Sequence, residues 1–173
     1  EKTKKYYKKL IPINKKGFII QSPVDISFFN PNLNYPTDRL IDKTVKQKKI
    51  IIGTVANVSP VKDLKLLLRT VEKLSSYSNK IIFIVVGSIH NSQKNYYEHL
   101  LDNISRQRIK NFFFLGPRMD VRPLLKIIDI YVCSSKHESS PLSLLEAMAM
   151  KKAIVSTDVG DVKDFINNGV DGF

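Results

Sequence analysis

The run IIDIYVC (residues 127–133) is followed after three residues by HESSPLSLLEAMAM (residues 137–150), and these two segments decide the fold class. The first is largely apolar and rich in β-branched residues, so it predicts a buried strand at Ile130–Cys133. In the second, Pro141 suits the first turn of a helix, and the residues after it are good helix formers. A buried strand that runs directly into a helix is the unit from which parallel sheets are built.

The same alternation extends outward from these segments, from residue 50 to the end of the chain. Five short apolar runs predict strands at Ile50–Val55, Ile81–Val86, Phe112–Leu115, Ile130–Cys133 and Ala153–Ser156. Apolar residues at helical spacing predict five helices between these strands and after the last one. The first three have inward-facing apolar stripes, namely Leu64, Leu67, Leu68, Val71 and Leu74; then Tyr97, Leu100, Leu101 and Ile104, in a helix capped by Ser92; then Val121, Leu124, Leu125 and Ile128. The fourth helix begins at Pro141, and the fifth covers about Val162–Asn167. This pattern predicts a doubly wound, parallel α/β sheet (Rossmann-like), which binds its ligands at the carboxyl ends of the strands.

The composition is that of a soluble globular domain. Of the 173 residues, 43% are hydrophobic and 25% are charged, and no apolar run approaches the ~20 residues that span a bilayer. The single cysteine, Cys133, can form no internal disulfide, which fits a reducing, cytoplasmic compartment. No His, Cys, Asp and Glu residues have the spacing of metal ligands, so no metal is expected.

The positive charge of the chain is concentrated in its first part. The net charge is +12, and residues 1–49 hold twelve lysines and arginines against four acidic residues. Such an excess favours anionic partners, namely nucleic acid, acidic lipid or phosphorylated small molecules, although a solvated lysine-rich surface explains it equally well. We expect residues 1–49 to be a basic lead-in and linker, with one strand and a turn within Phe18–Asp25. Residues 50–173 would then form the α/β domain, truncated at its C-terminus because the chain stops directly after a predicted turn.

The predicted start of the helix at Pro141 has the features of an anion site. If Ser139 or Ser140 caps this helix, the N–H groups of Leu142 and Ser143 point out of its first turn. A helix N-terminus carries about half a positive charge and binds phosphate groups well.

Two carboxylates flank this helix start, Glu138 in the preceding loop and Glu146 one turn into the helix. A carboxylate beside a bound anion is unfavourable unless it accepts hydrogen bonds from neutral hydroxyl groups. The arrangement therefore indicates a phosphate with hydroxyl-rich groups on both sides, as in a nucleotide sugar. The alternative is that the two glutamates suit the helix dipole and are eight residues apart by chance.

Glu138 and Glu146, continued by Ala147-Met148-Ala149, resemble the E-x7-E motif of the retaining glycosyltransferases of family 4, which have the GT-B fold. Further segments resemble the family in the same order: Ser22–Pro31 (N-G-V-D…F-x-P), Ile52–Asp63 (G-R-L-x-x-x-K-G), Phe114–Gly116 (F-L-G), Thr157–Asp164 (T-D-x-G-G-x-x-E) and Asn168–Phe173 (N-G-x-N-G-x). The resemblance covers about residues 18–173. Asn57 stands where the family usually has arginine, and Asp63 stands where it usually has glycine.

The resemblance implies one half of a GT-B fold, the carboxy-terminal domain that binds the nucleotide-sugar donor. It implies a retaining hexosyltransferase that moves a sugar from a UDP-sugar or GDP-sugar to a glycan or lipid-linked acceptor, without a cofactor or metal. The amino-terminal acceptor domain would be missing, so we expect this fragment to be inactive alone. The expected location is the cytoplasm, at the inner face of the membrane, where the basic residues could contact acidic lipid.

The resemblance also implies roles for single residues. Lys62 would contact the donor diphosphate, and Glu138 would lie beside the transferred sugar; these two are the expected catalytic residues. The other expected donor contacts are the ribose hydroxyls at Glu146, the diphosphate at the amides of Ser140, Leu142 and Ser143, and the nucleobase at the loop of Arg118 and Met119. Asn57 can donate a hydrogen bond but carries no charge. Either Arg118 or a residue of the missing domain could compensate for the absent arginine.

Two other interpretations remain open. The basic residues 1–49, with Tyr6 and Tyr7 among lysines, could grip a nucleic acid backbone, although no RNA-binding motif accompanies them. Alternatively, the loss of the arginine at Asn57 could mark a non-catalytic relative that only binds nucleotides or partners.

Overall fold

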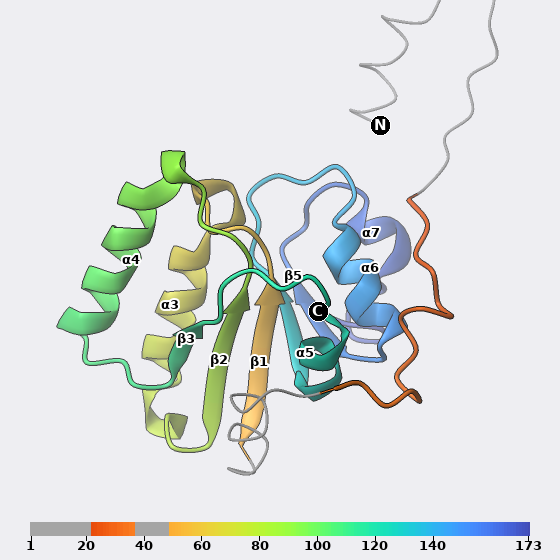
Figure 1. Ribbon diagram of the computed structural model, residues 1–173, viewed down its shortest axis with the longest axis horizontal. Coiled ribbons are helices and arrows are strands. Elements are labelled where there is room, and N and C mark those ends of the chain that lie inside the picture. The colour runs from red at the N-terminus through yellow and green to blue at the C-terminus, as the bar shows by residue number, and fades with distance from the viewer. Residues whose placement is uncertain (1–21, 37–48) are drawn as a thin grey trace, which may run out of the picture.

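A computed structural model of the chain describes residues 22–36 and 49–173 (Figure 1). It contains a five-stranded sheet in the order β3-β2-β1-β4-β5, in which every neighbouring pair is parallel. The strands are β1 (Ile50–Val55), β2 (Ile81–Val86), β3 (Phe112–Phe114), β4 (Ile130–Cys133) and β5 (Ala153–Ser156). The predicted doubly wound, Rossmann-like sheet is therefore confirmed, and only β3 is one residue shorter than its apolar run.

Helices cover both faces of the sheet (Figure 1). One face carries α3 (Leu64–Lys73) and α4 (Lys94–Arg106), and the other carries α5 (Arg122–Ile127), α6 (Leu142–Ala149) and α7 (Val162–Phe165). Within residues 49–173, the connections contain the short 3-10 helices η1 (Pro60–Lys62), η2 (Ser75–Tyr77) and η3 (Asn91–Gln93).

Strand β2, which lies between β3 and β1, illustrates why the strands read as continuous apolar runs. All six of its residues are buried. Phe83 and Val85 pack toward α3 and α4, whereas Ile82, Ile84 and Val86 pack into the core beneath α5 and α6. Because alternate side chains point to opposite faces and both faces are covered, neither set can be polar.

Three local predictions about the helices are wrong. Ser92 lies inside η3 and does not cap α4, because a 3-10 turn precedes that helix. Leu101, expected on the inward stripe of α4, is 40% exposed, whereas Leu100 is fully buried. The last helix ends at Phe165 and does not continue to Asn167.

Residues 22–36 pack against α5. Phe29 and Tyr35 contact the core on that side, and the guanidinium of Arg122 stacks 3.7 Å from the ring centroid of Phe28. Of the strand predicted at Phe18–Asp25, residues 18–21 lie outside the described part. Residues 22–25 form no strand there; the Asp25 carboxylate instead accepts hydrogen bonds from the next turn. The basic residues 1–21 and 37–48 are likewise not described, and the division of the chain at residue 49 remains a prediction.

Candidate functional site

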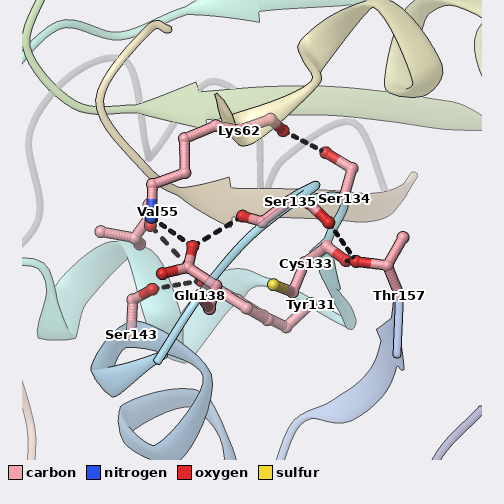
Figure 2. Close-up of polar contacts among 9 residues, drawn as sticks. All are labelled: Val55, Lys62, Tyr131, Cys133, Ser134, Ser135, Glu138, Ser143 and Thr157. Carbon is pink, nitrogen blue, oxygen red and sulfur yellow. Dashed lines mark hydrogen bonds and ion pairs between the residues drawn. The ribbon is translucent and has the colours of Figure 1, made fainter. Parts of the chain in front are cut away.

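The carboxyl ends of the strands carry an ion pair between two residues far apart in the sequence (Figure 2). The Nζ atom of Lys62, at the end of η1, lies 2.5 Å from Oε1 of Glu138, in the loop between β4 and α6. Both side chains are largely shielded, with 27% of Lys62 and 15% of Glu138 exposed. The hydroxyl of Ser135 donates a second hydrogen bond, of 2.7 Å, to the same Glu138 oxygen.

The 3-10 helix η1, which carries Lys62, ends at a residue with a left-handed backbone. Asp63 directly follows η1 and adopts a left-handed conformation, with φ 42° and ψ 50°. Such a conformation is the usual reason for a glycine, and aspartate is among the few other residues that tolerate it. The departure from the glycosyltransferase pattern at this position is therefore compatible with the same turn.

A cleft of about 320 Å³ opens beside the ion pair, between the ends of β1 and β2 and the loop after β3. Three of the predicted site residues line it: Asn57, Lys62 and Arg118. Gly87 allows the walls to approach closely, because a Cβ atom there would lie 2.1 Å from the carbonyl oxygen of Ala56. The strand ends thus bring together residues from three separate parts of the chain.

Asn57 is oriented within this cleft by a neighbour that the sequence interpretation had not singled out. The hydroxyl of Ser88 donates a hydrogen bond of 3.1 Å to the Asn57 side-chain oxygen. With its oxygen engaged in this way, the amide group has its N–H donors left to offer to a ligand.

The start of α6 differs in detail from the prediction. Pro141 lies at the N-cap position and not within the first turn, and neither Ser139 nor Ser140 caps the helix. The first hydrogen bond of the helix runs from the Leu144 N–H to the Pro141 carbonyl. Consequently the N–H groups of Leu142 and Ser143 have no hydrogen-bond acceptor among the described residues, as the anion-site hypothesis requires.

Polar side chains around this helix start are unequally satisfied. The hydroxyl of the fully buried Tyr131 donates a 2.8 Å hydrogen bond to Ser143 Oγ (Figure 2). Ser140 Oγ, in contrast, is buried and has no hydrogen-bond partner within the described part of the chain.

The remaining predicted site residues lie outside the lining of the cleft. Glu146 is half-buried on α6, and this burial raises the pKa of its carboxyl group. Leu142 is half-exposed, and Met119 is fully exposed in the loop after β3.

The described residues contain neither a cluster of metal ligands nor a membrane-spanning helix. No group of three or more His, Cys, Asp and Glu side chains in residues 22–36 and 49–173 could hold a metal ion. Over the same residues, no helix has the length and apolar character needed to cross a membrane.

Comparison with known proteins identifies the family. The model of the family "Glycosyl transferases group 1" matches residues 37–173, which is most of the chain. The chain belongs to this family. The sequence-based identification of a GT-B glycosyltransferase is thereby confirmed at the level of the family and the fold.

Individual proteins agree with this assignment. Over 158 residues, the domain is 25% identical to the UDP-Gal:alpha-D-GlcNAc-diphosphoundecaprenol alpha-1,3-galactosyltransferase of Escherichia coli, covering 90% of this chain and 40% of that enzyme. It superimposes with a TM-score of 0.73 on Anabaena Alr3699/HepE in complex with UDP and glucose, at 24% identity, covering 87% of this chain and 40% of that one. It also superimposes on the C-terminal domain of the glycosyl transferase group 1 protein LpcC of Francisella tularensis, with a TM-score of 0.72 at 23% identity, covering 87% and 78%.

The chain spans less than half the length of the curated relatives it matches. What these comparisons establish is therefore a glycosyltransferase domain with a Rossmann-like fold.

Proposed function

We propose that this chain is the donor-binding domain of a retaining glycosyltransferase, which transfers a hexose-type sugar from a UDP-sugar or GDP-sugar to a glycan or lipid-linked acceptor. The observation that carries the proposal is the ion pair of Lys62 with Glu138, beside a cleft that Lys62 lines together with Asn57 and Arg118. A cation, an amide and a second cation around one cleft suit a diphosphate, and the carboxylate suits the hydroxyl groups of a sugar.

In this proposal the donor diphosphate replaces Glu138 as the partner of the Lys62 ammonium. The N–H groups of Leu142 and Ser143, together with that of Ser140, add neutral hydrogen bonds at the positive end of α6. Arg118, in the loop after β3, supplies the second positive charge. In the glycosyltransferase family that the sequence resembles, an arginine at the position of Asn57 usually supplies it. The loop of Arg118 and Met119 contacts the nucleobase, and Glu146 accepts hydrogen bonds from the ribose.

The reaction that these residues support is transfer with retention at the anomeric carbon. The bond between this carbon and the phosphate oxygen breaks, and the acceptor hydroxyl oxygen bonds to the carbon from the same face. The acceptor proton passes to the departing phosphate oxygen, whose negative charge Lys62 stabilises. Glu138 orients the sugar and stabilises the positive charge that develops on the ring in the transition state.

A lipid-linked acceptor is supported by the relatives. The Escherichia coli relative and one from Campylobacter jejuni are both named for acceptors built on a diphospho-undecaprenol lipid. The acceptor would bind to a separate amino-terminal domain of the whole enzyme, so this domain alone would not turn over. The basic residues 1–49 would contact anionic lipid at the inner face of the cytoplasmic membrane.

The first test is a thermal-shift and calorimetric screen of the chain with UDP, GDP, UDP-glucose and GDP-mannose. A donor at one hundred times its dissociation constant should stabilise the fold by about 2.7 kcal/mol. Glu146→Ala should weaken binding of the stabilising nucleotide, whereas Glu72→Ala, at an exposed position on α3, should leave it unchanged. Absence of any nucleotide effect, together with salt-dependent binding of an oligonucleotide, would favour a nucleic-acid-binding module instead.

A second outcome would distinguish a binding module from an enzyme. If the chain binds a nucleotide sugar but a complete protein containing it transfers no sugar to any lipid-linked acceptor, the domain is a non-catalytic nucleotide-binding relative. The neutral Asn57 in the diphosphate position is the observation that favours this second candidate.

A further inference from the structure

The loop that follows β4 is fixed on both sides by hydrogen bonds. Toward η1, the hydroxyl of Ser134 donates to the Lys62 carbonyl at 2.8 Å, and the Lys136 N–H donates to the Val61 carbonyl at 2.8 Å. Toward β5, the hydroxyl of Thr157 donates to the Ser135 carbonyl at 2.6 Å (Figure 2). This loop therefore ties the backbone of Lys62 to the ends of two strands, and it does so without using the Lys62 side chain.

The Glu138 carboxylate is held through only one of its two oxygens. Oε1 accepts hydrogen bonds from both Lys62 Nζ, at 2.5 Å, and Ser135 Oγ, at 2.7 Å. Oε2 has no hydrogen-bond partner among the described residues. A carboxylate held in this way presents a second oxygen to whatever binds beside it.

The two partners of Oε1 differ in what else they can bind. Lys62 lines the cleft and its side chain is 27% exposed, so an anion entering the cleft competes for its ammonium group. Ser135 is only 3% exposed and does not line the cleft. Its hydroxyl is consequently committed to Glu138, whatever enters the cleft.

We propose that Ser135 is the positioning residue that keeps Glu138 aimed at the donor sugar once the diphosphate has drawn Lys62 away. The proposal rests on the proposed function, because it assigns Lys62 to the diphosphate and Glu138 to the sugar. Ser134 has the parallel task of fixing the Lys62 backbone, so that the ammonium can change partners while its main chain stays in place.

A purely structural role for Ser135 makes a different prediction. A buried hydroxyl that merely satisfies its own hydrogen bond contributes to folding, and its loss would affect every ligand equally. A positioning role affects only the part of the donor that Glu138 contacts. The ratio of affinities for a nucleotide sugar and for its nucleoside diphosphate separates the two roles.

The first experiment measures this ratio by isothermal titration calorimetry, with UDP and UDP-glucose as one pair and GDP and GDP-mannose as the other. Ser135→Ala should weaken binding of the nucleotide sugar about tenfold while changing that of the diphosphate less than twofold. Ser135→Thr, which keeps the hydroxyl, should restore most of the loss. Ser139→Ala, an exposed position in the same loop, is the matched control and should change neither. Equal effects of Ser135→Ala on both ligands, or none, would overturn the proposal.

The second experiment requires no nucleotide and therefore separates this proposal from the proposed function. Crystal structures of Lys62→Ala and of the double variant Lys62→Ala/Ser135→Ala are compared. Glu138 should stay hydrogen-bonded to Ser135 in the single variant and should turn away in the double variant. A Glu138 that leaves Ser135 in the single variant, or keeps its place in the double variant, contradicts the positioning role. If the wild-type chain binds neither nucleotide pair, the proposed function fails, and this comparison still decides whether Ser135 holds Glu138.

Discussion

Two neighbouring parts of the loop between β4 and α6 differ in how their polar groups are satisfied. In residues 134–138, the side chains of Ser134, Ser135, Lys136 and Glu138 all have a hydrogen-bond or ion-pair partner. In residues 139–143, Ser140 Oγ is buried without a partner, and two backbone N–H groups at the start of α6 have no acceptor among the described residues.

This difference separates a part that is organised before any ligand binds from a part that a ligand would complete. A buried polar group without a partner costs about 1–3 kcal/mol. A ligand that forms a hydrogen bond with Ser140 Oγ at the start of α6 recovers that cost. A ligand that binds to residues 134–138 must first break an existing contact.

The largest loss of stability is expected at the contact of Gly160 with the backbone of Glu138 and Ser139, where the two parts of the loop meet. Gly160, with φ 60°, lies where an added Cβ would be 2.4 Å from the Ser139 carbonyl oxygen and 2.9 Å from that of Glu138. Gly160→Ala should therefore destabilise the fold by about 3 kcal/mol, from the clash together with the left-handed backbone. Urea denaturation measures the change.

Gly169→Ala is the matched control, because Gly169 also has a left-handed backbone, with φ 80°, but open space around it. It should cost only about 1 kcal/mol, the price of the conformation alone. Equal losses for the two variants would mean that the loop carrying Gly160 does not brace residues 138–139.

The next largest effect concerns the organised part. Lys62→Ala removes the cation of the ion pair. On the proposed function it should lower the binding free energy for UDP or GDP by about 2 kcal/mol, which raises the dissociation constant roughly thirtyfold. Calorimetric titration measures it. Lys136→Ala, which removes a more exposed lysine 3.8 Å from Asp63, is the control and should weaken binding little. A Lys62→Ala protein that remains folded and binds nucleotide as tightly as the wild type would remove Lys62 from the site.

The two parts also differ in how well they could be predicted. Hydrophobic periodicity is a property of local sequence, and it was sufficient for all five strands and for the order of strands and helices. The resemblance around Glu138 and Glu146 indicated the family, and the match of the family model confirmed it. Lys62 and Glu138, 76 residues apart, were assigned to one site, and the structure brings them into contact.

What the sequence could not supply were the hydrogen bonds that depend on the packed arrangement. The roles of Ser134 and Ser135 follow from their distances to Lys62 and Glu138, and nothing in a pair of serines specifies such partners. Their one local signal was two consecutive polar residues directly after a buried strand. The prediction that Ser139 or Ser140 caps α6 was wrong. It relied on the general preference of serine for the N-cap position, and in this loop Pro141 occupies that position.

A smaller effect is expected where the core supports the start of α6. Tyr131→Phe removes the hydroxyl that bonds Ser143 Oγ and should destabilise the fold by about 1 kcal/mol. Tyr97→Phe is the matched control, since the Tyr97 ring packs edge-on against Phe114 and its hydroxyl makes no hydrogen bond to the described residues. Thermal denaturation of both variants should show a lower melting temperature only for Tyr131→Phe. Similar decreases for the two variants would mean that the hydrogen bond from Tyr131 to Ser143 does not stabilise the fold.

The smallest effect is the change in protein stability with pH that Glu146 causes. Glu146 lies within α6, one turn after its start. Burial raises the pKa of this carboxyl group above its ordinary value of 4.5, so the folded protein keeps the proton to higher pH than the unfolded chain does. Stability therefore falls as the pH rises between the unfolded and the folded pKa, and the loss persists at neutral pH. Glu146→Gln cannot ionise and should be more stable than the wild type at pH 7, by less than about 1 kcal/mol because the side chain is only half-buried.

The gain from Glu146→Gln should disappear below about pH 4, where the wild-type carboxyl is protonated in both states. Urea titrations at pH 4 and pH 7 measure it. The exposed Glu72→Gln accounts for the general effect of removing one negative charge from a protein of net charge +12, and it is subtracted at each pH. A Glu146→Gln protein that is less stable than Glu72→Gln at pH 7 would mean that the carboxylate already has a stabilising partner in the fold. Glu146 would then belong with the organised residues 134–138 and not with the part that a ligand completes.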